Sequence, residues 1–512
     1  MKSSGAISDK IKTLDELADI IQTLKKEGKR IVQCHGVFDL LHPGHIRHFE
    51  AARHEGEVLI VTVTPDEYVG KGPGRPVFNQ RLRVESIAAL QCVDYVAINK
   101  WPTAVETIKK LKPDVYAKGS DYANPSTDLS GGISKEEATI KSIGGRIHFT
   151  DEPTFSSTKL LNLHFNVYPE KAERFLEDFR QRYTADDIIE RLQALGKMKI
   201  LVIGDAIIDE YHYCEALGKS PKGTTITTRY IGEEVFAGGV LAAANHIAGF
   251  CENVHLVTCL GKQNSYEEFI TAHLKPNITP KFFERDDTST VIKRRFVQPN
   301  SLSKMFEVCF MDEHDLPEFV NREVCDYLKN TVKDYDLVLV ADFGHGFIGK
   351  DVVKVLCDNA RFLAVNTQTN SANTGYNLII KYPRADYICI DEPEARLACR
   401  DRFSRLEDIT QSIAEKLQCN RVIITHGSFD TLAYTPEEGF FNIPVFSNEV
   451  IDTTGAGDAL LSVTSPCVAA GYPIELAGFI GNAVGALKVR IVCNRSSVEP
   501  TSLFKFITAL LK

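Results

Sequence analysis

Two short segments of this 512-residue chain combine glycine and aspartate, the first of them with histidine as well, in patterns suited to polyphosphate chemistry. The first runs from His35 to His45 and reads His-Gly-Val-Phe-Asp-Leu-Leu-His-Pro-Gly-His. The second runs from Asp452 to Asp458 and reads Asp-Thr-Thr-Gly-Ala-Gly-Asp. Each is expected to lead into a helix, whose exposed N–H groups and positive dipole end favour a phosphate. The sequence therefore predicts two separate triphosphate sites.

In the first segment, His42 and His45 would both lie in the first turn of the helix. Imidazoles placed there can stabilise the charge that grows on a transferred phosphate, and Gly44 lets a phosphate approach the backbone. A packed or zinc-binding histidine pair is the commoner meaning of an isolated His-x-x-His. The strand-loop-helix context favours the phosphate site here, together with the preceding residues Gly36, Phe38 and Asp39.

In the second segment, Gly455, Ala456 and Gly457 predict a turn whose free N–H groups form an anion hole for a transferred phosphoryl group. Asp458 would then be placed to accept the proton of an attacking hydroxyl. A flexible loop with a helix cap is the alternative. The full seven-residue pattern favours catalysis.

The elements around the first segment alternate between strand and helix patterns, which predicts a doubly wound parallel sheet. Helices are expected near 13–27, 80–90 and 104–111. The expected strands are 30–34, 58–63, 95–98, 115–117 and 146–149.

A charged, helix-like stretch at 164–197 carries no strand pattern and is expected to join two domains, 1–163 and 198–512. A second α/β series follows it. Its expected strands are 199–204, 337–340, 362–365, 387–390 and 422–425.

Charge and cysteine usage limit the class of protein. A net charge of −9 argues against a nucleic-acid binder. The 13 cysteines form no Cys-x-x-Cys pair, which argues against a zinc site and a disulfide framework. With no signal peptide and no apolar run near 18 residues, the sequence predicts a cytoplasmic protein that is not embedded in a membrane.

Residues 30–162 resemble the nucleotidylyltransferase superfamily, and most closely the adenylyltransferase half of the bifunctional heptose kinase/adenylyltransferases of lipopolysaccharide core synthesis. The resemblance implies that His42 and His45 steady the transition state, that Lys71 binds phosphate and that Arg83 is the helix arginine of the site. It also implies nucleotide or substrate contacts from the loop with Gly119 and Asp121, and phosphate contacts from Ser156, Ser157 and Thr158.

In this superfamily a substrate phosphate attacks the α-phosphorus of a nucleoside triphosphate and releases pyrophosphate, usually with Mg²⁺. Such a transfer needs positioning and charge neutralisation more than a reactive side chain. The resemblance implies ATP as the donor, with CTP possible.

Residues 198–512 resemble the ribokinase-like carbohydrate kinases, so the expected fold class is α/β with a nucleotidylyltransferase domain before a ribokinase-like domain, the inverse of the heptose enzyme. The resemblance implies sugar contacts from Asp205, Asp209, Gly238 and Gly239. It implies that Glu394 and Asp391 hold magnesium, although the family has Asn where this chain has Asp391. The implied nucleotide contacts are Thr425, Gly427 and Asn482.

Three departures affect the sugar side of this second domain. The heptose kinases have Ala-Ala-Asn after the paired glycines, whereas this chain has Val-Leu-Ala at 240–242. Their Pro-Glu-Ala-Pro is Pro-Lys-Gly-Thr at 221–224, and their Asp-Pro-Lys is Asn-Thr-Gln at 366–368. These changes predict an acceptor other than heptose 7-phosphate.

Two hypotheses follow. In the first, the chain is a bifunctional enzyme that phosphorylates a sugar or sugar phosphate and transfers a nucleotidyl group to a sugar 1-phosphate. It would be a homo-oligomer, and a separate phosphatase would act between the two steps. In the second, only the N-terminal half is catalytic, as a cytidylyltransferase for a polyol phosphate or phosphonate, and the other half binds sugar or dimerises.

Overall fold

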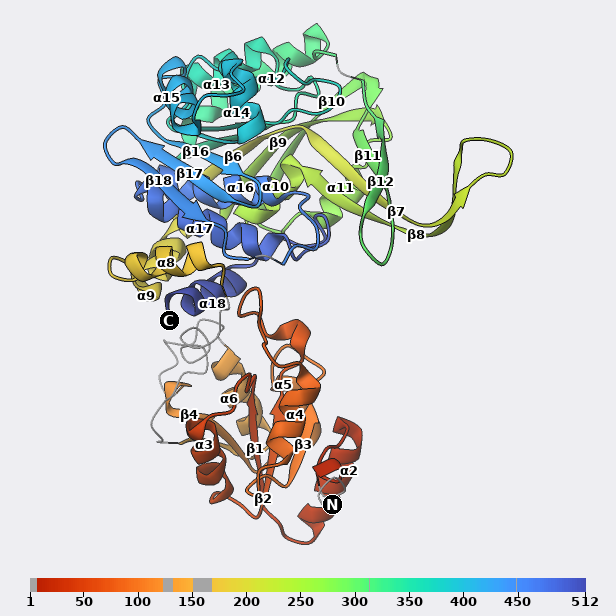
Figure 1. The fold of residues 1–512 in the computed structure, drawn as a ribbon, viewed down its shortest axis with the longest axis vertical. Helices are drawn as coiled ribbons and strands as arrows, with labels where there is room; N and C mark the ends of the chain where they lie inside the picture. Colours follow the sequence, from red (N-terminus) through yellow and green to blue (C-terminus); the bar gives the residue numbers. More distant parts are fainter. Residues whose placement is uncertain (1–6, 123–131, 151–167, 313, 448) are drawn as a thin grey trace. The chain divides into compact units, whose positions relative to one another are not determined.

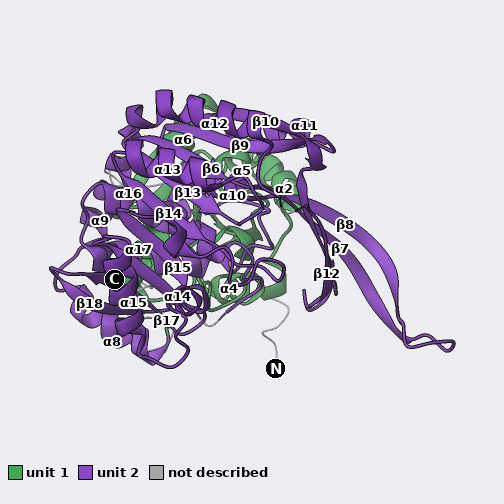
Figure 2. Cartoon of the chain, turned by 90° about the horizontal axis from the view of Figure 1, so that it is seen from above, with its two compact units in different colours: residues 1–168, 504–512 green, residues 169–503 purple. Residues whose placement is uncertain are grey.

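The computed structural model describes residues 7–122, 132–150, 168–312, 314–447 and 449–512. These residues form two compact units, which Figure 2 shows in different colours. Unit 1 comprises Met1–Tyr168 together with Phe504–Lys512, and unit 2 comprises Pro169–Leu503. The chain passes from one unit to the other inside the predicted junction.

Unit 1 is built on a five-stranded parallel sheet in the order β3-β2-β1-β4-β5, so the doubly wound prediction is confirmed. Its strands are β1 (Ile31–Gly36), β2 (Val58–Val63), β3 (Tyr95–Ile98), β4 (Val115–Gly119) and β5 (Arg146–Thr150). Its helices are α2 (Leu14–Lys26), α3 (Pro43–Arg53), α4 (Gln80–Ala88), α5 (Val105–Leu111) and α6 (Gly132–Ser142).

The central strands of this sheet are buried on both faces because helices cover both sides. All six residues of β2 are buried, and Ile31 of β1 pairs with Val58 of β2. The strand order reverses between β1 and β4, and open α/β sheets bind ligands at that switch point, beyond the strand ends. Gly36 ends β1 and Gly119 ends β4, so the first motif leaves the sheet at this place.

Two amphipathic helices open unit 2, α8 (Glu170–Phe179) and α9 (Ala185–Ala194), where the helical junction was predicted. They pack on the unit and are not an extended linker. Phe179 of α8 is fully buried, and its ring stacks on that of Phe479 with centroids 4.3 Å apart.

The main sheet of unit 2 has nine strands in the order β10-β9-β6-β13-β14-β15-β16-β17-β18. Only the last two strand pairs are antiparallel. The strands are β6 (Lys199–Gly204), β9 (Asn253–Gln263), β10 (Ile278–Ser289), β13 (Leu337–Asp342), β14 (Leu363–Thr367), β15 (Tyr387–Asp391), β16 (Val422–His426), β17 (Asp430–Thr435) and β18 (Gly439–Pro444). The five strands predicted from sequence all belong to this sheet.

Helices alternate with these strands along the sequence, and α18 follows the last of them. They are α10 (Val240–Ile247), α11 (Glu267–His273), α12 (Glu318–Thr331), α13 (Lys350–Asn359), α14 (Glu392–Cys399), α15 (Leu406–Lys416), α16 (Ala456–Ala469), α17 (Ile474–Lys488) and α18 (Pro500–Leu511).

A second sheet of four strands, β12-β11-β7-β8, was not predicted from sequence. Its strands are β7 (Ala206–Lys219), β8 (Ile226–Gly239), β11 (Val291–Val297) and β12 (Lys304–Phe310). We call it the small sheet. The β7–β8 hairpin projects from the rest of unit 2 (Figure 1). Its outer half is exposed on both faces, so it lacks the apolar alternation from which strands are recognised.

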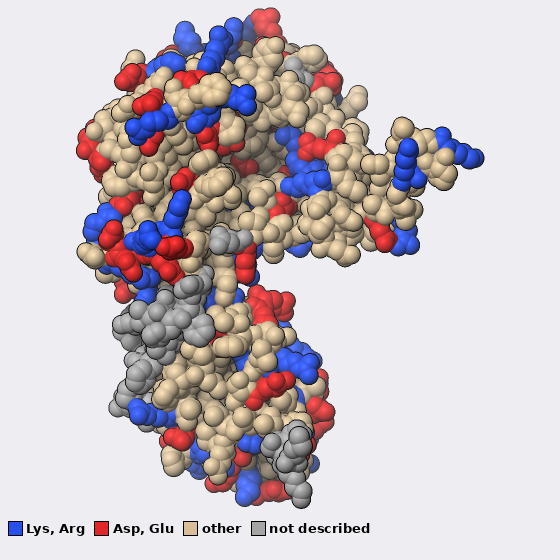
Figure 3. Space-filling model, in the orientation of Figure 1, with Lys and Arg blue, Asp and Glu red and all other residues tan. Residues whose placement is uncertain are grey.

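Charges of both signs are interspersed over the surface of each unit on the face shown in Figure 3. Over the described ranges, the chain forms no helix with the length and apolar character needed to span a bilayer.

Candidate active sites

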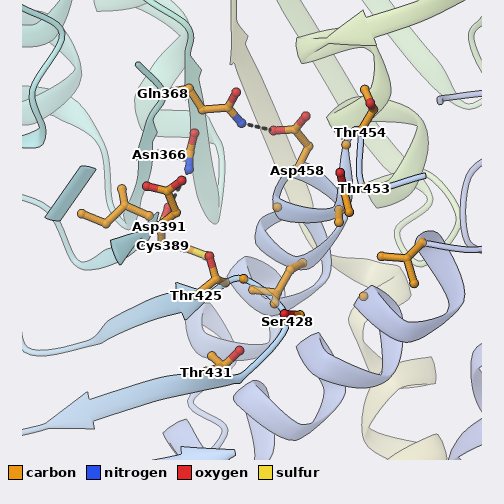
Figure 4. A pocket seen from close by; sticks show the side chains of 18 of the residues that line it. Asn366, Gln368, Cys389, Asp391, Thr425, Ser428, Thr431, Thr453, Thr454 and Asp458 are labelled. Carbon is orange, nitrogen blue, oxygen red and sulfur yellow. Dashed lines mark hydrogen bonds between the residues drawn. The ribbon is translucent and has the colours of Figure 1, made fainter. Parts of the chain in front are cut away.

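A cavity of about 840 Å³ opens in unit 2 where the main sheet, the small sheet and the start of α16 converge. Figure 4 shows Asn366, Gln368, Cys389, Asp391 and Thr425 at strand ends on one side, with Asp458 and the turn before α16 on the other. The carboxyl ends of parallel strands are where α/β sheets bind ligands. The second sequence motif therefore lines a cavity at the place where such sheets bind ligands.

The turn before α16 has the geometry of an anion hole. Gly455 is its N-cap with φ +76°, in the left-handed region that favours glycine. An added Cβ would also lie 2.5 Å from Asn494 Oδ1. Among the described residues, none accepts a hydrogen bond from the backbone N–H of Gly455, Gly457 or Asp458. These N–H groups lie at the cavity, as expected of a phosphate site.

Asp458 is buried in the first turn of α16 and lines the cavity. Burial and the nearby charge of Asp209 raise the pKa of its carboxyl to about 6. Gln368 Nε2 donates a hydrogen bond of 2.7 Å to Asp458 Oδ1, which favours the charged form. A carboxylate with a pKa near neutral is suited to accept a proton at physiological pH.

Of the four residues implied to hold a sugar, two line the cavity and two do not. Asp209 and Gly239 line the cavity, and Asp209 forms an ion pair with Arg295. Gly238 packs against that carboxylate, because an added Cβ would lie 2.0 Å from Asp209 Oδ2. Asp205 is not among the residues that line the cavity. Its carboxylate accepts hydrogen bonds from the N–H groups of the loop at 343–347, the one from Phe343 at 2.9 Å.

Sequence reasoning missed two basic residues of β11, Lys293 and Arg295, that line the cavity. They lie two positions apart and therefore share a face of the strand, where Lys293 is in register with Asp209 of β7. Arg295 pairs with Asp209 and with Glu307. Lys293 forms no ion pair within the described part of the chain, and its ammonium lies 6.0 Å from the Phe343 ring centroid.

The three implied nucleotide contacts, Thr425, Gly427 and Asn482, all line the cavity. Gly427 has φ +57° and follows β16 directly. Asn482 on α17 uses its amide to hold the β17–β18 hairpin. It donates to Ile443 O at 2.8 Å and accepts from Thr431 Oγ1 at 2.6 Å.

Asp391 and Glu394, the implied magnesium residues, form a capping box at the start of α14. Each carboxylate accepts a hydrogen bond from the other residue's backbone N–H, and both residues line the cavity. Burial and the charge of Asp391 raise the pKa of Glu394 to about 8. No group of three or more potential metal ligands occurs among the described side chains. Any cation here would need further ligands from water or a substrate.

In unit 1, the first motif leaves β1 and enters α3 as predicted. His42 is the N-cap of α3, and the rings of His42 and His45 stack with centroids 3.9 Å apart. Burial, together with the charges of His42, His48 and Lys71, lowers the pKa of His45 to about 3, and burial also lowers the pKa of His42. Both imidazoles therefore start neutral at pH 7 and can donate a hydrogen bond to a phosphate.

The implied phosphate lysine, Lys71, is near this motif. Burial lowers its pKa to about 8, while the charge of Asp39 opposes the shift. Asp39 also accepts a hydrogen bond of 3.1 Å from Phe78 N–H and forms a buried ion pair with Arg75. Phe38 has φ +50°, and its ring fills the space beside Gly36, where an added Cβ would lie 2.9 Å away.

Arg83 lies near the site but braces the surrounding loops. Its fully buried guanidinium donates to Thr64 O at 2.8 Å and Phe78 O at 2.9 Å, and it forms an ion pair of 2.6 Å with Asp66. Gly119 ends β4 beside open space. The side chain of Asp121 and the whole of Ser156, Ser157 and Thr158 lie outside the described residues.

The comparisons with known proteins agree with this two-site arrangement. The model of the pfkB family of carbohydrate kinases matches residues 197–499, which is more than half of the chain. The cytidylyltransferase-like model matches residues 34–162.

Curated relatives named bifunctional protein HldE match the N-terminal domain. The protein from Methylobacillus flagellatus is 40% identical over 152 residues, which is 29% of this chain and 30% of that protein. The protein from Geobacter sulfurreducens is 36% identical over 167 residues, 32% of each chain. The chain spans about a third of the length of these relatives.

Among solved structures, phosphofructokinase-2 from Escherichia coli in complex with substrates and products aligns with a TM-score of 0.51 at 12% identity. The alignment covers 62% of this chain and all of that one. At that identity, the likeness concerns the fold alone.

Proposed function

This chain belongs to the pfkB family of carbohydrate kinases and has a cytidylyltransferase-like domain before the kinase fold, and from that premise we propose a bifunctional enzyme. Unit 2 would transfer a phosphoryl group from ATP to a hydroxyl of a sugar or sugar phosphate of the heptose type. Unit 1 would transfer a nucleotidyl group from ATP or CTP to a sugar 1-phosphate and release pyrophosphate. The observation that carries the proposal is Asp458 beside the open anion hole of α16.

In the kinase step, the substrate hydroxyl would lie between Asp458 and the γ-phosphate of ATP. Asp458 accepts the hydroxyl proton as the oxygen attacks the γ-phosphorus and the bond to the β-phosphate oxygen breaks. The N–H groups of Gly455 and Gly457 then stabilise the charge on the transferred group. The raised pKa of Asp458 supports its role as base.

Mg²⁺ fits this site as an ion that takes ligands from both the protein and the nucleotide. Asp391 and Glu394 both line the cavity, and Mg²⁺ is usually held by one or two carboxylates together with substrate phosphates. We propose that these two residues hold it. When bound, the ion would neutralise phosphate charge.

A phosphate on the acceptor would explain the positive charge of β11. Lys293 lines the cavity and has no ion-pair partner among the described residues. It is in register with Asp209 of β7, so the two residues are on the same face of the small sheet. A neutral sugar would leave that ammonium unused, whereas an acidic acceptor would pair with it. We therefore favour a sugar phosphate over a free sugar.

In the nucleotidyl step, a phosphate oxygen of the sugar 1-phosphate attacks the α-phosphorus of the triphosphate, and pyrophosphate leaves. His42 and His45 would donate hydrogen bonds to the reacting phosphate, and Lys71 would neutralise its charge. The stacked, neutral imidazoles at the start of α3 support these roles.

Three further parts of the proposal concern the setting of the enzyme. If the kinase product is a bisphosphate, a separate phosphatase must remove one phosphate before the nucleotidyl step. Exposed apolar residues on the small sheet, including Leu217, Ile226 and Phe306, support a homo-oligomer. Scattered cysteines support the cytoplasm as its location.

The test is a measurement of ADP release by the full chain over a panel of sugars and sugar phosphates, with Asp458→Asn as control. Pyrophosphate release from ATP and from CTP with sugar 1-phosphates tests unit 1 in the same preparation. Activity with at least one acceptor, lost in the control, is expected. A chain that binds ATP but phosphorylates no acceptor, while still releasing pyrophosphate with a polyol phosphate or phosphonate, would favour the alternative in which only the first domain is catalytic.

A further inference from the structure

Lys488, the last residue of α17, is a fully buried lysine at the edge of the kinase site. A buried ammonium is costly unless every part of it is compensated, so such a group needs a specific reason to be there. Nothing in the sequence motifs points to it, because it lies 30 residues after Asp458 on another helix.

The ammonium binds two main-chain carbonyls. Lys488 Nζ donates to Thr454 O at 2.7 Å and to Cys493 O at 2.5 Å. Thr454 belongs to the turn before α16, and Cys493 belongs to the loop after α17. The lysine therefore ties the phosphate turn to a neighbouring loop.

This contact sets the direction of the next N–H. In a trans peptide, the carbonyl and the N–H of the following residue point in opposite directions. With Thr454 O turned toward Lys488, the N–H of Gly455 points away from it. Gly455 lines the cavity, and no described residue accepts a hydrogen bond from its N–H. The lysine thus holds one donor of the anion hole in place.

Neutralising Asp452 would be the simplest structural role for a buried lysine here, but Asp452 already has its partners. Its carboxylate accepts from Tyr211 Oη at 2.6 Å, from Lys304 Nζ at 3.0 Å and from Cys493 N–H at 2.9 Å. Lys488 donates its hydrogen bonds to carbonyls and not to this carboxylate.

The charges around Lys488 allow it to stay protonated. Burial lowers its pKa, and the charges of the Cys493 thiol, Asp452, Asp458 and Asp209 act in the opposite direction. Behind the turn, the ammonium also adds positive potential to the place where a phosphoryl group would bind.

We propose that Lys488 is a positioning residue of the kinase site, which orients the Thr454–Gly455 peptide so that its N–H faces the transferred phosphoryl group. This rests on the proposed kinase function. The lysine touches no reacting atom and acts through the peptide.

The test compares full-length wild type, Lys488→Met and Lys488→Ala, with Lys275→Met as the matched control. Lys275 is also in unit 2, but its ammonium pairs with Glu499, and it is not among the residues that line the kinase cavity. The measurements are kcat and KM for phosphoryl transfer, and the dissociation constants of ATP and ADP. Thermal unfolding and pyrophosphate release report the state of the protein in each sample.

We expect Lys488→Met to lower kcat by about 10²- to 10³-fold, the usual effect of losing one preorganised donor, with a smaller change in KM. Its preference for ATP over ADP should fall, because the γ-phosphate loses a donor. Methylammonium should restore the kcat of Lys488→Ala at least about tenfold by occupying the vacated space, whereas the bulkier tetramethylammonium should not.

A Lys488→Met enzyme with kcat within about threefold of wild type and an unchanged preference for ATP would overturn the inference. So would a variant that loses its fold and is not rescued by methylammonium, because that result assigns a structural role. If the wild type phosphorylates no acceptor, the kinase proposal fails by itself. In that case, the preference of the protein for ATP over ADP still tests the role of Lys488. A loss of this preference in Lys488→Met would support the positioning role, and an unchanged preference would refute that role.

Discussion

The hydrogen bond from Gln368 to Asp458 should set the acidic limb of the kinase pH profile. Gln368→Leu removes the Nε2 donor, which lies 2.7 Å from Asp458 Oδ1. The donor stabilises the charged carboxylate, so its loss raises the pKa of Asp458. The base is then deprotonated only at higher pH, and the acidic limb of kcat/KM should move upward.

The size of the shift follows from the strength of the bond. A hydrogen bond to a charged group contributes about 1.5–3 kcal/mol, and one pKa unit corresponds to about 1.36 kcal/mol. Starting from a pKa of about 6, the midpoint should rise by roughly one to two units. At pH 6 the deprotonated fraction should fall from about half to between roughly a tenth and a hundredth, whereas at pH 9 the two enzymes should be similar.

The assay is kcat/KM for phosphoryl transfer from pH 5 to 9, with ADP measured directly so that no coupling enzyme adds its own pH dependence. Asp458→Asn is the control, and its residual activity should lack the limb. An acidic limb that stays in place in Gln368→Leu, or persists in Asp458→Asn, would show that another group titrates and that Asp458 is not the base.

Three other predictions concern the two sites. Asp458→Asn should reduce phosphoryl transfer by roughly 10²- to 10⁴-fold while ATP affinity, measured by calorimetry, stays within a few-fold; a large loss of affinity would contradict the role of base. His45→Ala should lower pyrophosphate release at least about a hundredfold and leave ADP release unchanged, so normal pyrophosphate release would mean a misplaced site. Gly455→Ala should abolish most kinase activity and lower the thermal midpoint, because φ is +76° and the new Cβ would lie 2.5 Å from Asn494 Oδ1; a fully active variant would show that the turn adapts.

The centres of the unit 1 sheet and of the main sheet of unit 2 could be predicted, because their strands are short, buried and rich in apolar residues. The strands predicted at 58–63 and 95–98 match β2 and β3 residue for residue. The small sheet could not be predicted in the same way. Its strands are long, partly exposed on both faces and paired across large separations in sequence, as in the pairing of β7 with β11.

In the candidate sites too, local features could be predicted from sequence and long-range features could not. His42, His45 and Asp458 lie within short motifs, so their place at helix starts followed from local spacing. Lys293 reaches the cavity from a strand 165 residues before Asp458, and only the tertiary fold brings the two together. Sequence patterns cannot reveal such a neighbour.

Asp205 illustrates a different limit. An aspartate after a buried strand fits a sugar-binding role. In this structure, both carboxylate oxygens of Asp205 also accept hydrogen bonds from N–H groups of the loop at 343–347. The residue type alone could not distinguish a ligand contact from a loop brace.

The assignment of the last nine residues to unit 1 affects how the chain can be divided. Phe506 is fully buried, and the backbone at Gly72, with φ +91°, runs so close to its ring that an added Cβ would lie 1.9 Å from it. Lys71 is the neighbour of that glycine. Two segments far apart in the sequence thus form one unit, and unit 2 lies between them in the sequence. A fragment that stops after residue 168 would lack the aromatic ring of Phe506, so the loop bearing Lys71 has all of its support only when the chain extends past that residue.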